Sequence, residues 1–217
     1  MQNIGASYKD ALSDQHLAFA QDLVSEAELI DECVEQVLVD AISSVPRELF
    51  VSPEFSSKIW DDCSLSIGYG REMLRPSLLV RMLGVLGLRK GMRILEVGCG
   101  CGYASAVMAR AGAEVFALES VGLLAQRTRK LLDSLKYQSI LVKRGDGLRG
   151  WAEHAPYSSI VVFDLYESIP AELLVQLDKN SGKMIGLVGT KERQVLTLWV
   201  SKAAGISIYE LEEGCFL

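Results

Sequence analysis

This chain of 217 residues has only two histidines, and it has fewer basic than acidic residues. The five cysteines are odd in number and scattered, unlike the disulfide framework of a small secreted domain. Lys and Arg total 22 against 28 Asp and Glu, a net charge of −6, so we expect no nucleic-acid partner. The 49% hydrophobic content excludes a disordered chain.

Long apolar runs are absent as well. The longest, residues 77–88, contains Arg81 and is too short to span a bilayer, so no membrane association is expected. The first ten residues lack the basic start and apolar core of a secretory signal. We therefore expect a cytoplasmic protein of one domain, or of one domain with an appendage.

The N-terminal third differs in pattern from the remainder. Residues 1–24 show little periodicity, whereas apolar residues from Leu29 and Ile30 to Ile42 recur at helical spacing. Ser25, followed by Glu28 three residues later, matches a capping box and predicts that a helix begins there. Its acidic opposite face is expected to be solvated, with a partner-binding role as the alternative. Pro76 suits the first turn of a further helix, ending near residue 86.

Beyond residue 89, short apolar strands alternate with helical segments. We expect strands at 93–97, 114–119, 139–142, 159–163 and 183–188, and helices at 103–111, 121–135 and 171–177. Residues 194–200 and 206–211 follow without a clear intervening helix and read as an antiparallel pair. This order predicts a Rossmann-like α/β fold, in which a mostly parallel sheet has helices on both faces and an N-terminal helical extension packed on it.

The segment from 94 to 103, ILEVGCGCGY, has the order strand, glycine-rich turn, helix. Glycines at 98, 100 and 102 permit a tight turn and the close approach of a ligand. The next strand ends at Glu119, whose carboxylate can accept hydrogen bonds from a ribose diol. Glu96 would repel a pyrophosphate and suits a positively charged ligand such as S-adenosylmethionine. The alternatives are a dinucleotide enzyme and a glycine corner without a ligand.

Cys99 and Cys101 lie within this turn, and a C-x-C pair can bind metal. No other Cys or His stands at ligand spacing, and zinc takes at least three protein ligands. We expect no metal site here, only small residues filling the loop. His16 and His154 are isolated and are given no catalytic role.

Several motifs resemble the protein-L-isoaspartate O-methyltransferase family of class I methyltransferases, over about 170 residues from Val45 onward. They read VPRELFV at 45–51, LSIGYG at 65–70, LEVGCGCGY at 95–103, GDGLRGW at 145–151 with APY at 155–157, and IP at 169–170 with QL at 176–177 and VG at 188–189.

The resemblance implies a seven-stranded sheet, S-adenosylmethionine as cofactor with S-adenosylhomocysteine as product, and a protein or peptide carboxylate, such as that of L-isoaspartyl residues in damaged proteins, as acceptor. It implies an N-terminal helical extension and substrate-side loop over 1–75 and a cofactor-binding domain over 76–217. Asp146 is expected near the adenine, a plain turn aspartate being the alternative. The expected cofactor-binding residues are Glu96, Gly98, Gly100, Gly102, Tyr103, Glu119, Asp146 and Gly147.

The departures from the family pattern lie on the acceptor side. The family loop reads G-Q-T-I-S-x-P, whereas residues 70–76 read GREMLRP, so the catalytic Ser/Thr position is Leu74, with neighbours Arg71 and Glu72. Asp164 stands where the family has a small residue. No catalytic residue is assigned, and the oligomeric state is not predicted.

Leucine cannot donate a hydrogen bond to a carboxylate, so weak isoaspartyl methylation is expected. Two alternatives stay open. One is a methyltransferase with a different acceptor, and the other is a catalytically inactive, cofactor-binding interaction or regulatory protein on the same fold.

Overall fold

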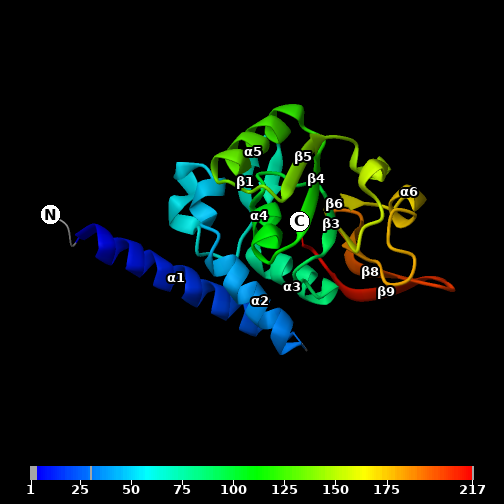
Figure 1. The fold of residues 1–217 in the computed structure, drawn as a ribbon, viewed down its shortest axis with the longest axis horizontal. Coiled ribbons are helices and arrows are strands. Elements are labelled where there is room, and N and C mark those ends of the chain that lie inside the picture. Colours follow the sequence, from blue (N-terminus) through cyan, green and yellow to red (C-terminus); the bar gives the residue numbers. More distant parts are fainter. Residues whose placement is uncertain (1–3, 30, 217) are drawn as a thin grey trace.

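The computed structural model describes residues 4–29 and 31–216, with side chains from residue 14 onward (Figure 1). In these residues seven strands form one sheet in the order β5-β4-β3-β6-β7-β8-β9. Pairing is parallel from β5 to β7 and antiparallel for β7–β8 and β8–β9. The strands are β3 (Arg93–Val97), β4 (Glu114–Glu119), β5 (Ile140–Arg144), β6 (Ser159–Tyr166), β7 (Lys183–Gly189), β8 (Gln194–Lys202) and β9 (Gly205–Gly214).

Helices and short 3-10 turns surround this sheet, and a separate two-stranded hairpin precedes α3. The α/β class with a mostly parallel seven-stranded sheet is thereby confirmed. The helices are α1 (Ile4–Glu26), α2 (Glu32–Ser43), α3 (Pro76–Leu86), α4 (Tyr103–Arg110), α5 (Gly122–Ser134) and α6 (Ala171–Leu174). The 3-10 turns are η1 (Arg47–Phe50), η2 (Pro53–Lys58), η3 (Gly147–Arg149) and η4 (Ala152–His154), and the hairpin is β1 (Leu65–Gly68) with β2 (Arg71–Met73).

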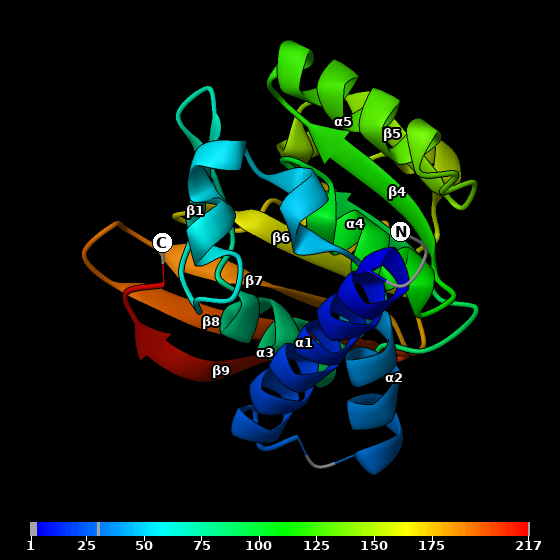
Figure 2. The same ribbon diagram turned by 90° about the vertical axis from the view of Figure 1, so that its left-hand side faces the viewer.

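Alternation of side chains along the buried strands divides the core into two layers. On β3, Ile94 belongs to the layer packed under α3, α4 and α5, whereas Leu95 and Val97 belong to the layer under η3, η4 and α6. Figure 2 shows the first face beneath the long helices. The second face is covered mainly by short turns whose anchors include Trp151 and Tyr157.

The strand order reverses beside β3. The chain proceeds from β3 outward to β4 and β5, then returns to the other side of β3 with β6. In open α/β sheets such a reversal leaves a crevice beyond the carboxyl ends of the strands, where ligands bind. The turn that follows β3, residues 98–102, lies at this crevice.

The expected helix start at Ser25 is wrong. Helix α1 runs from Ile4 to Glu26, the chain turns at Glu28 with φ 47°, and α2 begins only at Glu32. The Ser25 hydroxyl donates to the Asp22 carbonyl within α1, whereas the Asp31 carboxylate accepts from the backbone N–H groups that open α2. Ile30, expected within the helix, lies outside the described residues.

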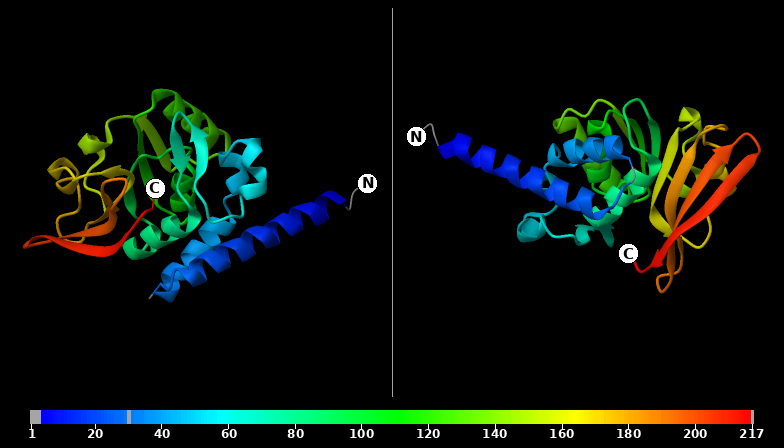
Figure 3. Two further views of the ribbon diagram at one scale, coloured as in Figure 1. Left: turned by 180° about the vertical axis from the view of Figure 1, so that it is seen from behind. Right: turned by 90° about the horizontal axis from the view of Figure 1, so that it is seen from below.

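Helices α1 and α2 pack against each other and against α3, and α2 also contacts α4. Figure 3 shows α1 projecting from one end of the molecule, with β8 and β9 at the other. None of the described helices combines the length and the apolar character that a bilayer crossing requires.

Three later elements differ in length from the expectation, and one of them, β9, is four residues longer than the expected strand 206–211. Strand β6 continues to Tyr166 rather than residue 163, past a register shift against β7. Helix α6 makes a single turn and ends at Leu174 instead of residue 177. Helix α6 ends there because Gln176 is bonded outside the helix. The Gln176 carbonyl accepts from the Tyr157 N–H, and the Gln176 side-chain amide donates to the Arg149 and Glu172 carbonyls.

The corrected cap of α2 can be tested. The Asp31 carboxylate accepts from the Cys33 and Val34 N–H groups at 2.9 and 3.3 Å. Asp31→Ala should therefore lower the free energy of unfolding by about 1 kcal/mol in urea titrations. Ser25→Ala, the matched control, should change it by less than about 0.5 kcal/mol. A larger loss of unfolding free energy for Ser25→Ala than for Asp31→Ala would show that the helix begins at Ser25.

Candidate functional site

A cavity of about 740 Å³ lies at the crevice beyond β3. One wall is the glycine turn with the ends of β4 and β5, and the other is the β1–β2 hairpin with the ends of β6 and β7. Its lining includes Gly70, Arg71, Glu72, Met73, Leu74, Gly98, Cys99, Gly100, Cys101, Tyr103, Glu119, Ser120, Asp146, Gly147, Asp164, Tyr166, Lys191 and Gln194.

The glycine turn needs backbone that other residues avoid. Gly98 has φ 83°, and a Cβ there would lie 3.1 Å from the Asp164 carboxyl. Gly102 has φ 87° as the residue before α4, and a Cβ there would lie 2.7 Å from the Thr128 methyl. Gly98 and Gly100 line the cavity, whereas Gly102 is buried behind them against α5. Gly102 thus shapes the turn without facing the cavity.

Glu119 connects this turn to the next helix. Its Oε2 accepts from the Gly100 N–H at 3.0 Å, and its Oε1 accepts from the Val121 N–H at 2.8 Å. The side chain lines the cavity although the residue is only 3% exposed. A carboxylate held in this way keeps lone pairs for further donors, as expected for a ribose-binding residue.

Glu96 lies beneath the turn, outside the cavity lining. On β3 it shares a face with Ile94 and points under α4, where the Ser105 hydroxyl donates to Oε2. Burial raises the pKa of Glu96 to about 8; the Ser105 hydrogen bond opposes this shift and Glu119 adds to it. The structure therefore places a protonated carboxyl, rather than an exposed anion, behind the turn.

Cys99 and Cys101 are buried in the turn, and burial raises the pKa of both thiols, that of Cys101 to about 11. They are therefore protonated at neutral pH and act as small space-filling side chains. Within residues 4–29 and 31–216, no three Cys, His, Asp or Glu side chains come together as metal ligands. All five cysteines lie in these ranges and carry free thiols.

Asp146 and Gly147 form the cavity wall after β5. The Asp146 carboxylate accepts from the Leu148 N–H at 3.0 Å and caps η3, so this residue is a turn aspartate that also faces the cavity. Gly147 is buried, and a Cβ there would collide with Val97 and approach the Tyr166 hydroxyl to 3.0 Å. Both expected positions therefore lie at one wall.

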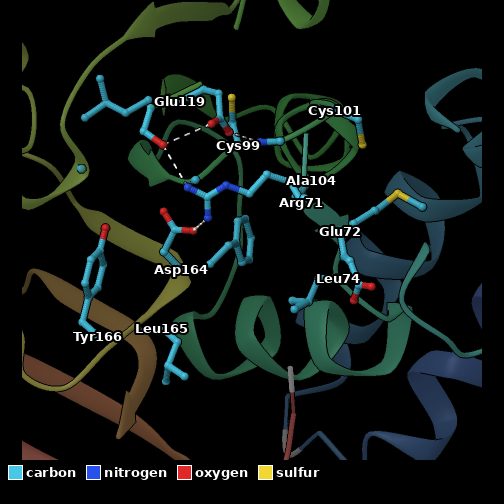
Figure 4. Close-up of a pocket in the computed structure, with 18 of the residues that line it drawn as sticks. Arg71, Glu72, Leu74, Cys99, Cys101, Ala104, Glu119, Asp164, Leu165 and Tyr166 are labelled. Atoms are coloured by element: carbon cyan, nitrogen blue, oxygen red, sulfur yellow. Dashed lines mark hydrogen bonds and ion pairs between the residues drawn. The ribbon is translucent and has the colours of Figure 1, made fainter. Parts of the chain in front are cut away.

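The wall formed by the β1–β2 hairpin and the end of β6 carries the departures from the family loop (Figure 4). Leu74 is half-buried and lines the cavity, and Glu72 is exposed on β2 opposite Ser66. The Arg71 guanidinium donates to the Asp164 carboxylate at 2.8 Å and to the Ser120 hydroxyl at 3.0 Å. The structure thus brings two departures, Arg71 and Asp164, into direct contact.

The VPRELFV segment supports this wall from behind. Arg47 is 1% exposed and donates to the Ile59, Asp61 and Cys63 carbonyls at 2.9 Å each, which fixes the chain entering β1. Phe50 packs edge-on against Tyr103, with ring centres 5.6 Å apart. Tyr103 lines the cavity and joins the two motifs.

Sequence reasoning missed four polar lining residues: Ser120, Tyr166, Lys191 and Gln194. Each lies at or just beyond the end of a strand. Tyr166 ends β6 and Lys191 follows β7, both at carboxyl ends of parallel strands, where ligands bind. That rule, applied to every parallel strand rather than to β3 alone, indicates both positions.

The raised pKa of Glu96 predicts a pH-dependent stability. The folded state holds this proton more tightly than the unfolded chain, so the contribution is full below about pH 4.5 and declines as the pH rises to about 8. Between pH 6 and pH 8 the ligand-free protein should lose about 2 kcal/mol that Glu96→Gln does not lose. Urea midpoints at both pH values measure this, with exposed Glu210→Gln as control. Parallel curves for wild type and Glu96→Gln would show that Glu96 is ionised when folded.

Two curated relatives show the extent of sequence similarity. A protein-L-isoaspartate O-methyltransferase from Gloeobacter violaceus is 38% identical over 172 residues, 79% of this chain and 83% of the relative. One from Methylorubrum extorquens is 38% identical over 180 residues, 82% of this chain and 78% of the relative.

Solved structures share the fold. A protein-L-isoaspartate O-methyltransferase aligns with a TM-score of 0.80 and 23% identity, covering 93% of this chain and 65% of the other. A beta-aspartate methyltransferase from Plasmodium falciparum, in complex with S-adenosyl-L-homocysteine, aligns with a TM-score of 0.75 and 21% identity, covering 93% and 96%. Residues 20–217 also match the sequence profile of the Protein-L-isoaspartate(D-aspartate) O-methyltransferase family. The chain belongs to this family.

Proposed function

We propose that this chain transfers a methyl group from S-adenosylmethionine to the carboxylate of an L-isoaspartyl residue in a protein or peptide. One observation carries the proposal: within a chain that matches the family over residues 20–217, Glu119 lines the cavity and holds the glycine turn beside it. The cavity volume of about 740 Å³ suits a small-molecule cofactor together with an acceptor side chain.

The residues present fit the cofactor. Glu119 would accept the ribose hydroxyls, the turn at Gly98 and Gly100 would admit the methionine part, and Asp146 with Gly147 would border the adenine. Glu96 and Gly102 would contribute indirectly, by supporting the turn and the start of α4. When bound, S-adenosylmethionine supplies an electrophilic methyl group, whose transfer to a carboxylate oxygen leaves a neutral thioether.

The acceptor side must mainly position its substrate. A carboxylate is already ionised at neutral pH, so no general base is required and alignment of the oxygen determines the rate. Leu74 excludes water from part of the wall but offers no hydrogen-bond donor. We further propose that residues 1–75 supply the acceptor-side loop, that 76–217 bind the cofactor, and that the enzyme works in the cytoplasm.

A methyltransferase with a different acceptor is the second candidate. Leu74 at the family's Ser/Thr position favours it, because an aliphatic side chain replaces a hydroxyl at the acceptor wall. Transfer to an isoaspartyl peptide, measured beside the matched aspartyl peptide, separates the two candidates.

The cofactor assignment predicts the effect of Glu119→Ala. This change removes hydrogen bonds from a charged acceptor, each worth about 1.5–3 kcal/mol. Binding of S-adenosylhomocysteine should weaken by about 2–4 kcal/mol in total, which is a fall in affinity of about 30- to 1000-fold. Calorimetric titration measures it, and Glu114→Ala, at the opposite end of β4, is the matched control. Unchanged affinity in a folded Glu119→Ala protein would show that the ribose is held elsewhere.

The acceptor assignment predicts slow wild-type transfer of labelled methyl to an isoaspartyl peptide, and none to the aspartyl peptide. Loss of one well-placed donor typically costs ~100- to 1000-fold in rate. Leu74→Ser should recover part of this, at least about tenfold in initial rate, and the double change Glu72→Thr with Leu74→Ser should recover more by removing an anionic charge. Exposed Leu123→Ser on α5 is the control and should leave the rate unchanged.

Failure would take one of two forms. If no variant methylates the isoaspartyl peptide although S-adenosylhomocysteine binds, the different-acceptor candidate replaces the proposal. If S-adenosylhomocysteine does not bind near millimolar concentration, both candidates are excluded.

A further inference from the structure

Two of the departures from the family pattern contact each other although 93 residues separate them in the chain. Where the family loop has Gln, Arg71 extends from β2, and where the family has a small residue, Asp164 extends from β6. Their side chains meet at 2.8 Å. A substitution in the hairpin is thus matched by a substitution in β6, on the same wall of the cavity.

The Arg71 guanidinium is fixed by partners at the ends of two strands. Nη1 donates to Asp164 in β6, and Nη2 donates to Ser120, which follows β4. These strands flank β3, so the guanidinium bridges the crevice beside the turn that follows β3; Figure 4 shows it between Glu119 and Asp164. The side chains of Arg71 and Asp164 remain 38% and 25% exposed, so incoming groups can reach them.

Donors remain available on this guanidinium. Arginine has five N–H groups, and the contacts to Asp164 and Ser120 use one each, which leaves three. A planar guanidinium can bind a carboxylate through two parallel hydrogen bonds, and one already held in place loses less conformational entropy on binding. Lys191, the other cation in the lining, is an exposed point charge on the turn after β7 and lacks both properties.

The acceptor wall is otherwise poor in groups that attract an anion. Its charged lining residues are Arg71 and Lys191 against Glu72 and Asp164, so formal charges cancel. Leu74, beside them, provides no donor. An anionic acceptor on this wall therefore needs a hydrogen-bonded ion pair with one specific cation, because the net charge of the wall does not attract it.

We infer that Arg71 binds the carboxylate of the methyl acceptor, on a wall where Leu74 offers no donor for the transfer step, and that Asp164 is the positioning residue that orients the Arg71 guanidinium toward the cavity. This inference rests on the proposed function, because it names how the acceptor is held. Asp164 acts through Arg71. When Arg71 is present, the Asp164 carboxylate orients the guanidinium that binds the substrate. When Arg71 is replaced, the Asp164 carboxylate is an unpaired anion that repels an anionic substrate.

The two roles predict that Asp164→Ala impairs methyl transfer in the wild type but improves it in the Arg71→Gln variant. Arg71→Gln, which restores the family residue, should raise KM for an isoaspartyl peptide about 10- to 150-fold. Asp164→Ala alone should mainly lower kcat, because the cationic charge stays while its orientation is lost. In the Arg71→Gln background, Asp164→Ala should instead lower KM again, at least about threefold, by removing the unpaired carboxylate.

Two controls accompany these variants. Arg81→Gln breaks a surface pair with Glu212 whose side-chain exposures, 44% and 38%, are similar, and it should change neither KM nor kcat. Calorimetric affinity for S-adenosylhomocysteine should stay within about twofold of wild type in every variant. If Arg71→Gln weakens this affinity as much as it raises KM, Arg71 binds the carboxylate of the cofactor and the inference is overturned.

Binding of the isoaspartyl peptide in the presence of S-adenosylhomocysteine separates this inference from the proposed function. If the wild type transfers methyl groups but Arg71→Gln leaves KM unchanged, the inference fails and the proposed function stands. If no methyl is transferred but the peptide binds and Arg71→Gln weakens that binding, the proposed function fails and the inference stands. If the peptide does not bind, or binds equally to wild type and Arg71→Gln without transfer, both are overturned.

Discussion

The carboxylate of Glu119 is the fixed point around which the cavity is arranged. It accepts N–H groups from Gly100 and Val121, so the turn after β3 and the start of α5 are held together before any ligand arrives. The parallel register then sets the remaining distances: Val97 pairs with Leu118 on one side and with Val162 on the other. Side chains beyond these pairs, from three adjacent strands, consequently meet at one crevice.

The two walls of that crevice are built differently. The wall proposed to bind the cofactor consists of backbone and of side chains bonded to backbone groups, such as Glu119 to the Gly100 N–H and Asp146 to the Leu148 N–H. The wall proposed to face the acceptor depends on a contact between two side chains from distant segments, Arg71 and Asp164. Substitution changes backbone geometry less readily than side-chain contacts, and this difference explains why the family's glycine motif persists here while its acceptor loop has changed.

The same distinction explains which parts of the fold and of the site could be predicted from the sequence. The strands from β3 to β7 were predictable because each is a short apolar run ended by Gly or polar residues, and Glu119 because it ends the strand after a glycine turn. The break before α2 was missed because Ser25 and Asp31 are both acceptable caps, and only packing selects between them. The alternation of side chains along β3 could have predicted that Glu96 points into the core. No local pattern in the sequence indicates that Arg71 contacts Asp164.

The outermost strand, β9, limits the size of the sheet. It leaves one edge of backbone N–H and C=O groups without a neighbouring strand, and such edges can recruit another chain. Its second half carries three glutamates, at 210, 212 and 213, of which Glu212 and Glu213 are paired with Arg81 and Arg193. A further strand arriving there would have to desolvate Glu210 and these two ion pairs, and this cost opposes edge-to-edge aggregation.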